Sequence, residues 1–284
     1  MPELPEIWNL ANEMDETLKE KRIAGLKVKQ AKCLNIPQEE FEKLVVNKEI
    51  QEATPRGKWI FVKLHPGVIF LLNLGMGGEV LYFPEEKDLP EKFKLRMDFH
   101  DGSLLTINFW WFGYAHAVRE EELSGHGMTS SLGISPLDDR EYTLENFQKL
   151  LSGKKGGIKS FLMDQRNIAG IGNVYIHDIL FRTGLHPNRK ISSLKEDEVE
   201  KLFRAIKENL KQSTDLGGLA YERNLFNQPG KFKDFLVGYR EGKPCPVCGT
   251  TIQKIKTGST SSYICPSCQR LEIDLASGNS ILEK

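Results

Sequence analysis

The sequence lacks the features that mark a chain for a membrane, for export or for a strongly charged partner. Its 284 residues include 39 basic and 39 acidic side chains, so bulk charge favours no class of partner and argues mildly against nucleic acid unless the basic residues gather on one face. There is no run of about 18 apolar residues and no apolar signal-peptide core. We therefore expect a soluble, intracellular protein that is long enough for two domains.

Cysteine is also scarce, but four of the five cysteines form a pattern. Cys245-Pro-Val-Cys248 and Cys265-Pro-Ser-Cys268 are two CxxC pairs separated by sixteen residues. This spacing is typical of a zinc ribbon, in which four thiolates surround one structural Zn²⁺ ion. Two disulfides are the alternative, but disulfides are rare in intracellular proteins. Cys33 stands alone, and we expect it to be a small core residue.

Hydrophobic patterning divides the chain into a first part rich in strands and a second part rich in helices. After a helix that begins at about Pro5, we expect residues 22–110 to be mainly strands of an antiparallel sandwich or barrel. The expected strands are 58–64, 67–74, 77–82, 94–99 and 103–108. A stretch rich in Gly, Ser and Pro at 124–139 is a candidate hinge. Beyond it, apolar residues recur at helical spacing in 142–151, 158–165, 174–184 and 198–213.

These patterns predict an α+β multidomain protein. Its expected parts are an N-terminal antiparallel β-sandwich lobe flanked by helices (1–128), a hinge (129–140), a helical domain (141–240), a zinc-finger hairpin (241–270) and a C-terminal extension that packs or frays (271–284). Two lobes joined by a hinge leave a cleft between them, which is a common place for a functional site.

Two short stretches need a further explanation. In the opening MPELPE, a helix start accounts for Pro5 and Glu6 but leaves Pro2 and Glu3 unexplained. In IAGIGNVY (168–175), glycines join two helical stretches, and such a turn can direct backbone N–H groups and a helix N-terminus towards a phosphate. A glycine turn between packed helices has the same composition, so this second stretch alone decides nothing.

Together, several stretches resemble one known family. MPELPE, LMDQRNIAGIGNVY and KPCPVCGTTIQKIKTGSTSSYICPSCQR, in this order and at about these separations, resemble the formamidopyrimidine-DNA glycosylase and endonuclease VIII family of bacterial base-excision enzymes. RGKWI and NLGMGG are further matches, and the resemblance spans residues 1–270. It implies a bifunctional DNA glycosylase and AP lyase with a helix-two-turn-helix lobe.

The resemblance also implies a catalytic mechanism. Removal of the initiator methionine makes Pro2 the new terminus, and its secondary amine attacks C1′ of the damaged nucleoside. The base leaves, a cationic iminium forms, and β- or β,δ-elimination cuts the strand. Glu3 is then the general acid and base, Glu6 holds the terminus by hydrogen bonding or simply caps the helix, and Lys58 contacts the phosphate beside the lesion.

The same resemblance assigns DNA contacts. Lys159 and Asn173 correspond to residues at the phosphates near the lesion. Met76 and Phe112 correspond to side chains that fill the hole left by the flipped nucleotide. We expect Lys58, Lys159, Lys254 and Lys256 to face the cleft, because the balanced net charge must be distributed unevenly if DNA binds there.

Three departures from the family pattern bear on specificity. Thr260 stands where an arginine usually contacts phosphates, and Trp111 stands where an arginine reads the orphaned cytosine, so we expect relaxed opposite-base preference. A Trp110–Trp111 pair packed in the core of the β-lobe is the alternative. The segment 217–232 replaces the recognisable loop that closes over 8-oxoguanine, so the preferred lesion stays open.

We therefore expect a DNA glycosylase and AP lyase that removes a damaged, oxidised base from double-stranded DNA, with one structural zinc ion. We expect a monomer in the bacterial cytoplasm, at the nucleoid and without membrane contact. The alternatives are a family member specialised for alkylated or crosslinked DNA, and a noncatalytic DNA-damage-binding protein on the same scaffold.

Overall fold

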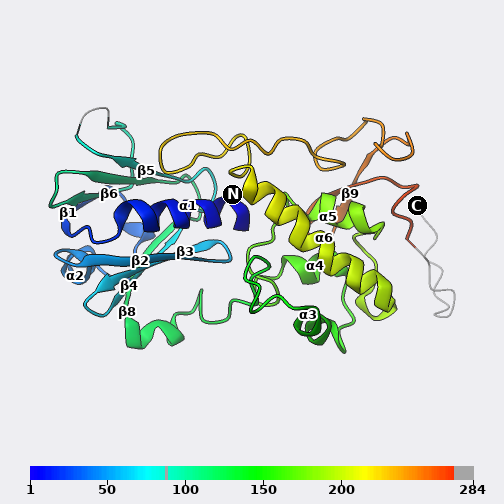
Figure 1. Ribbon diagram of the computed structural model, residues 1–284, viewed down its shortest axis with the longest axis horizontal. Helices are drawn as coiled ribbons and strands as arrows, with labels where there is room; N and C mark the ends of the chain where they lie inside the picture. The colour runs from blue at the N-terminus through cyan, green and yellow to red at the C-terminus, as the bar shows by residue number, and fades with distance from the viewer. Residues whose placement is uncertain (87–88, 272–284) are drawn as a thin grey trace.

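The computed structural model describes residues 1–86 and 89–271, and within them the chain forms two lobes that meet near the N-terminus (Figure 1). The expectation that residues 271–284 pack or fray lies, from residue 272 on, outside the described residues. None of the described helices is long and apolar enough to cross a membrane.

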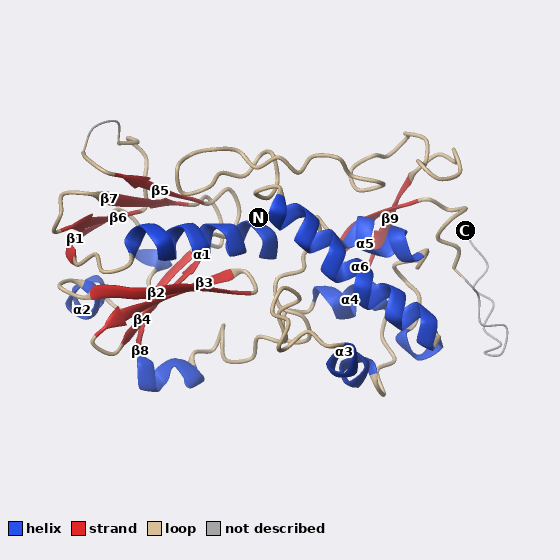
Figure 2. Cartoon of the chain, viewed as in Figure 1, coloured by secondary structure: helices blue, strands red, loops and turns tan. Residues whose placement is uncertain are grey.

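The N-terminal lobe contains two four-stranded antiparallel sheets (Figure 2). One has the order β1-β6-β7-β5 and the other has the order β2-β3-β4-β8. The strands are β1 (Ile23–Val28), β2 (Glu49–Arg56), β3 (Trp59–His65), β4 (Val68–Asn73), β5 (Glu79–Phe83), β6 (Leu95–Phe99), β7 (Leu104–Asn108) and β8 (Tyr114–Arg119). The predicted α+β fold with an antiparallel β-sandwich lobe is confirmed.

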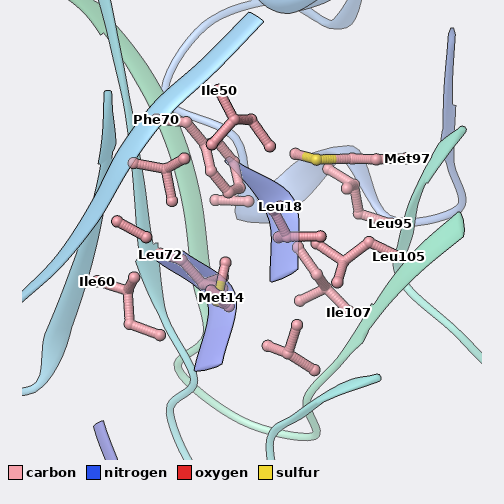
Figure 3. Packing of buried hydrophobic residues seen from close by; sticks show 14 of the residues in the cluster. Met14, Leu18, Ile50, Ile60, Phe70, Leu72, Leu95, Met97, Leu105 and Ile107 are labelled. Carbon is pink, nitrogen blue, oxygen red and sulfur yellow. The ribbon is translucent and has the colours of Figure 1, made fainter. Parts of the chain in front are cut away.

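Helix α1 (Leu4–Leu18) contributes to the core that both sheets share. Its buried apolar residues recur at helical spacing, and Met14 and Leu18 lie between side chains of the two sheets (Figure 3). Residues of β3 and β4 pack on one side, and residues of β6 and β7 pack on the other. The core therefore fixes the direction in which α1 presents its N-terminal end.

One helix of this lobe is not among the expected elements. Residues 22–110 are mainly strands, as expected, but Gln38–Val45 forms helix α2, which places Phe41 and Val45 in the core. Only these two side chains of the short helix are buried, so its apolar pattern is too brief to separate a helix from a loop. Cys33 lies in the 3₁₀ turn η1 (Ala31–Cys33) and is buried, as expected.

The second lobe is helical and has its own apolar core. After the 3₁₀ turn η2 (Glu120–Gly125), the chain forms α3 (Leu144–Leu151), α4 (Ile158–Met163), α5 (Ile176–Thr183), the 3₁₀ turn η3 (Ile191–Ser193) and α6 (Glu196–Asp215). The helices expected from periodicity are all present. Near the end of the described residues, β9 (Gln253–Thr257) and β10 (Thr260–Ile264) form a hairpin, and β10 packs on α5.

Residues 217–232, which we call the strap, connect the two lobes a second time. They follow α6 and run back to the N-terminal lobe, where they pass beside α1 (Figure 1, yellow). Leu219 and Phe232 at the ends of the strap lie in the core of the helical lobe, whereas Leu225 in its middle is buried in the core of the N-terminal lobe. Each core is thus completed by side chains from a shared segment.

Candidate active site at the N-terminal end of α1

The carboxylate of Glu3 is buried where α1 meets the glycine turn of the helical lobe. Its two oxygens accept hydrogen bonds from the backbone N–H groups of Gly172, at 2.7 Å, and Val174, at 2.9 Å. The Leu4 N–H donates to the Gly170 carbonyl at 3.1 Å. The N–H groups of this turn could have bound a phosphate, but those of Gly172 and Val174 donate to Glu3 instead. They fix its carboxylate in one position.

Glycine is required at residue 172 because two functional side chains converge on it. A Cβ atom there would lie 2.2 Å from Glu3 Oε1 and 2.4 Å from Lys58 Nζ. The carboxylate of Glu3 and the ammonium of Lys58 therefore flank the same point of the turn. Lys58 reaches this point from the β2–β3 turn, where its own carbonyl accepts a hydrogen bond from Asn73 Nδ2 at 2.9 Å.

Glu6 lies one helical turn further on and receives donors from three parts of the chain. Its carboxylate accepts from the N–H of Glu3 at 2.9 Å, from the N–H of Leu219 at 3.1 Å and from the hydroxyl of Tyr175. Burial raises the pKa of Glu6 to about 7, although these hydrogen bonds oppose the rise. Ser213 lies 2.6 Å from the Tyr175 hydroxyl and extends the network into α6.

Pro2 is buried at the start of this cluster, and Met1 precedes it. The amine nitrogen of Met1 lies 3.8 Å from Glu222 Oε1 of the strap. With Met1 attached, the nitrogen of Pro2 is an amide nitrogen and has no basic lone pair. The chemistry expected of Pro2 therefore depends on removal of Met1.

Asn173 lies in the same turn, between the two residues that hold Glu3. Its side-chain oxygen is buried and has no hydrogen-bond partner among the described residues. The hydroxyl of Tyr239 lies 3.5 Å from the Asn173 carbonyl oxygen. Asn173 is thus beside the cluster, with an unpaired side-chain oxygen.

The four cysteines come together as their spacing predicts. Their sulfur atoms all lie within 4.8 Å of one another, and the sulfur of Cys248 lies 3.5 Å from the sulfur atoms of Cys265 and Cys268. Four thiolates that bind zinc at about 2.3 Å in a tetrahedron have sulfur atoms about 3.8 Å apart. The residues therefore fit a structural metal ion.

Comparison with known proteins finds one family along most of the chain. Models of the formamidopyrimidine-DNA glycosylase N-terminal domain, the formamidopyrimidine-DNA glycosylase H2TH domain and the zinc finger found in FPG and IleRS match residues 1–108, 132–223 and 242–271. The formamidopyrimidine-DNA glycosylase of Pelotomaculum thermopropionicum is 32% identical over 277 residues, which cover 96% of this chain and 100% of the relative. The chain belongs to the formamidopyrimidine-DNA glycosylase family.

Solved structures of this family have the same architecture. The Lactococcus lactis Fpg in a complex with abasic-site DNA is 25% identical, has a TM-score of 0.86 and covers 95% of this chain and 100% of its own. A complex of the Lactococcus lactis Fpg with DNA that contains an oxidised pyrimidine has a TM-score of 0.85 at 25% identity, with the same coverage. Both structures contain damaged DNA.

The loop that carries Met76 and the loop that carries Trp110 and Trp111 lie side by side. The N–H of Met76 donates to the carbonyl of Trp111 at 2.8 Å, and the N–H of Trp110 donates to the carbonyl of Met76 at 3.1 Å. Trp110 is 73% exposed, Trp111 is 64% exposed and Phe112 is 67% exposed. The alternative of a Trp pair packed in the β-lobe core is therefore wrong. Phe112 also has a φ of 55°, which is rare for a bulky residue.

Lys159 does not face a cleft, contrary to expectation. It is only 1% exposed, and its ammonium donates to Thr260 Oγ1 at 2.9 Å, to the Ser261 carbonyl at 2.7 Å and to Ser262 Oγ at 2.9 Å. The short α4 points its side chain under the hairpin, where the hairpin supplies all three acceptors. Burial lowers the pKa of Lys159 to about 8. Lys159 thus holds the hydroxyl of Thr260 in place.

Sequence reasoning missed three residues of the site. Tyr175 donates to Glu6, Ser213 contacts the hydroxyl of Tyr175, and Glu222 faces the N-terminal amine. Tyr175 stands within the matching stretch LMDQRNIAGIGNVY, so the motif could have indicated it. Ser213 and Glu222 carry no such signal, because only the fold brings α6 and the strap to the start of α1.

Proposed function

We propose that this chain is a DNA glycosylase and AP lyase of DNA repair that acts through the amine of Pro2 after Met1 is removed. The observation that carries the proposal is the fixed, buried carboxylate of Glu3 next to Pro2, with the ammonium of Lys58 converging on the same turn. A protein that only binds DNA needs neither a secondary amine nor a fixed carboxylate at its terminus.

In the proposed reaction, the nitrogen of Pro2 attacks C1′ of the damaged nucleotide and the C1′–base bond breaks. Glu3 protonates the ring oxygen of the sugar, so that the ring opens to an iminium. The positive iminium makes the C2′ proton acidic, and loss of this proton cleaves the strand by elimination. Glu6 keeps the start of α1 in place through its contact with the N–H of Glu3.

The proposed partner is double-stranded damaged DNA, which is also what the solved relatives hold. Lys58 and Asn173 would contact phosphates near the lesion, and Thr260 would do so from the hairpin that Lys159 supports. Met76, Trp111 and Phe112 would fill the hole left by the flipped nucleotide. We propose that the protein acts as a monomer at the bacterial nucleoid, in the cytoplasm.

We propose that residues 245–268 hold one structural Zn²⁺ ion through Cys245, Cys248, Cys265 and Cys268. The ion would fix the fold of the β9–β10 hairpin and take no part in the reaction. Elemental analysis is expected to find one zinc per chain, and a protein without zinc that keeps its hairpin would contradict this.

We propose the division into a catalytic β-sandwich domain (1–128), a hinge (129–140), a helix-two-turn-helix domain (141–240), a zinc finger (241–270) and an extension (271–284). We further propose an oxidised base as the substrate, with weak preference for the base opposite. Trp111 offers stacking, which tolerates any base, and not the several donors of an arginine.

Borohydride trapping on a duplex with one abasic site tests the proposed function. The wild-type protein is expected to form a covalent adduct and to cut the strand, because borohydride reduces the iminium to a stable amine. Pro2→Gly is expected to trap weakly through a primary amine, and a variant with an uncleavable residue before Pro2 is expected to form no adduct. Mass spectrometry of the active protein should show Pro2 at its terminus. An active protein that retains Met1 would overturn the proposal.

A further inference from the structure

The strap brings an acidic side chain to the N-terminal amine. The side chain of Glu222 is 13% exposed, and its Oε1 lies 3.8 Å from the amine nitrogen of Met1. Within residues 1–86 and 89–271, this carboxylate has no ion-pair or hydrogen-bond partner other than the N-terminal amine. A nearly buried carboxylate whose single partner is the chain terminus has no evident structural role.

The position of Glu222 is fixed on both sides along the chain. Before it, the N–H of Leu219 donates to Glu6. After it, Asn224 Nδ2 and the N–H of Leu225 each donate to Glu13 of α1 at 2.9 Å. The strap is therefore bound to the same helix that carries the proposed nucleophile, so Glu222 and Pro2 keep their relative positions.

The backbone of Met1 marks the space that a substrate would enter. The carbonyl carbon of Met1 is bonded to the nitrogen of Pro2, and C1′ of the nucleotide would be bonded to that nitrogen in its place. The amine nitrogen of Met1 lies two bonds beyond this carbon. In the nucleotide, the ring atoms next to the glycosidic nitrogen of the base also lie two bonds beyond C1′. The carboxylate of Glu222 therefore lies close to the place that the first ring atoms of the departing base would occupy.

Aromatic side chains accompany this carboxylate. Tyr221 immediately precedes Glu222 and is exposed, and Tyr239 is exposed beside the carbonyl of Asn173. Tyr239 has a φ of 58°, which is an uncommon conformation for a bulky residue. Exposed aromatic rings offer faces on which a flipped base can stack.

We propose that Glu222 is the acid that protonates the damaged base as it leaves. This proposal rests on the proposed function. The lone pair of the Pro2 nitrogen forms the bond to C1′, and the electron pair of the C1′–base bond stays with the base. The proton of the Glu222 carboxyl passes to the base, which departs neutral and leaves Glu222 as a carboxylate. The proton on the Pro2 nitrogen passes to the carboxylate of Glu3, which then donates it to the ring oxygen.

The surroundings of Glu222 suit this role. Burial raises the pKa of Glu222, whereas the N-terminal ammonium lowers it. The other titratable groups around the terminus are Glu3, Glu6, Lys58, Tyr221 and Tyr239. A carboxyl group with a raised pKa keeps its proton over a wider pH range, so base release by the wild type should slow as pH rises and Glu222 ionises.

Glu222→Gln separates the two steps of the reaction. Single-turnover base release from a duplex with an oxidised purine is expected to fall about 100-fold or more, because general-acid catalysis is lost. Strand scission at a ready-made abasic site is expected to stay within about threefold of wild type, because no base has to leave. Asp234→Asn is the matched control, since it makes the same charge change on an exposed residue beyond the strap, and it should alter neither step.

Two further measurements test the role of Glu222 even if Glu222→Gln folds poorly. In the wild type, base release should slow as pH rises, and this decrease at alkaline pH should be absent in Glu222→Gln. The defect should also shrink for lesions whose bases are better leaving groups. Base release equal to that of Asp234→Asn, or an equal loss in both steps, would overturn the role of Glu222. A wild-type protein that forms no borohydride adduct with abasic DNA would overturn the proposed function instead.

Discussion

Two regions of the molecule hold their functional side chains in opposite ways. One is the start of α1, and the other is the tip, which is formed by the loops around Met76 and Trp111. Around Glu3 and Glu6, buried carboxylates are fixed by backbone N–H groups and by Tyr175. At the tip, large apolar side chains are exposed in the free protein. The groups proposed for chemistry are thus in place before DNA binds, whereas those proposed for recognition gain their partners only from the DNA.

The most severe test of this comparison is Glu3→Gln. Glutamine has one acceptor oxygen for two backbone donors and no proton to transfer, so single-turnover strand scission at an abasic site should fall by about 10²- to 10⁴-fold. The melting temperature and the affinity for abasic DNA should change far less. Glu16→Gln, on an exposed face of the same helix, is the control and should be fully active. Normal activity of Glu3→Gln would show that the fixed carboxylate is not used.

A second test uses pH, because the start of α1 contains the titratable carboxyl group of Glu6, whereas the apolar side chains of the tip do not titrate. The pKa of Glu6 is about 7 in the folded protein and near 4.5 when exposed, so between these values the folded chain binds more protons than the unfolded chain. The free energy of unfolding should therefore fall by about 3 kcal/mol from this group as pH rises from 4.5 to 7, and stay level above that. Chemical denaturation of wild type and Glu6→Gln at both ends of this range measures the difference. A difference that does not vary with pH would contradict the raised pKa.

Trp111→Ala tests the exposed tip. Loss of one stacking side chain should weaken binding to abasic DNA by about 1 to 3 kcal/mol and leave the melting temperature unchanged. Trp59 is buried in β3, so Trp59→Ala should instead destabilise the fold by about 3 to 5 kcal/mol. For the wild-type protein, affinities measured with each of the four bases opposite the abasic site should vary little. A strong preference for cytosine would show that Trp111 does not relax the choice of opposite base.

The smallest expected effect is that of Thr260→Arg on the hairpin. A guanidinium there adds one phosphate contact, so affinity should rise severalfold and the slope of log affinity against log salt should steepen by about one. Titrations at several salt concentrations measure this slope. An unchanged slope would show that position 260 does not reach the phosphates.

The zinc cysteines, the main helices and the central strands could be predicted from sequence, because each depends on local spacing or on a periodic apolar face. The burial of Lys159 could not, because it depends on a hairpin about a hundred residues later that supplies its acceptors. Helix α2 was missed because it buries few side chains. The resemblance indicated Glu3 and Asn173 as site residues. It did not predict that the N–H groups of the glycine turn donate to Glu3.

The burial of Leu225 in the N-terminal lobe limits how freely the parts of this protein can be exchanged. A fragment that ends near residue 128 would fold around an unfilled space, since the side chain that occupies it comes from beyond α6. Recombination between relatives would have to move the first lobe and this distant leucine together. The first lobe therefore depends on the second for part of its packing, although each lobe has a core of its own.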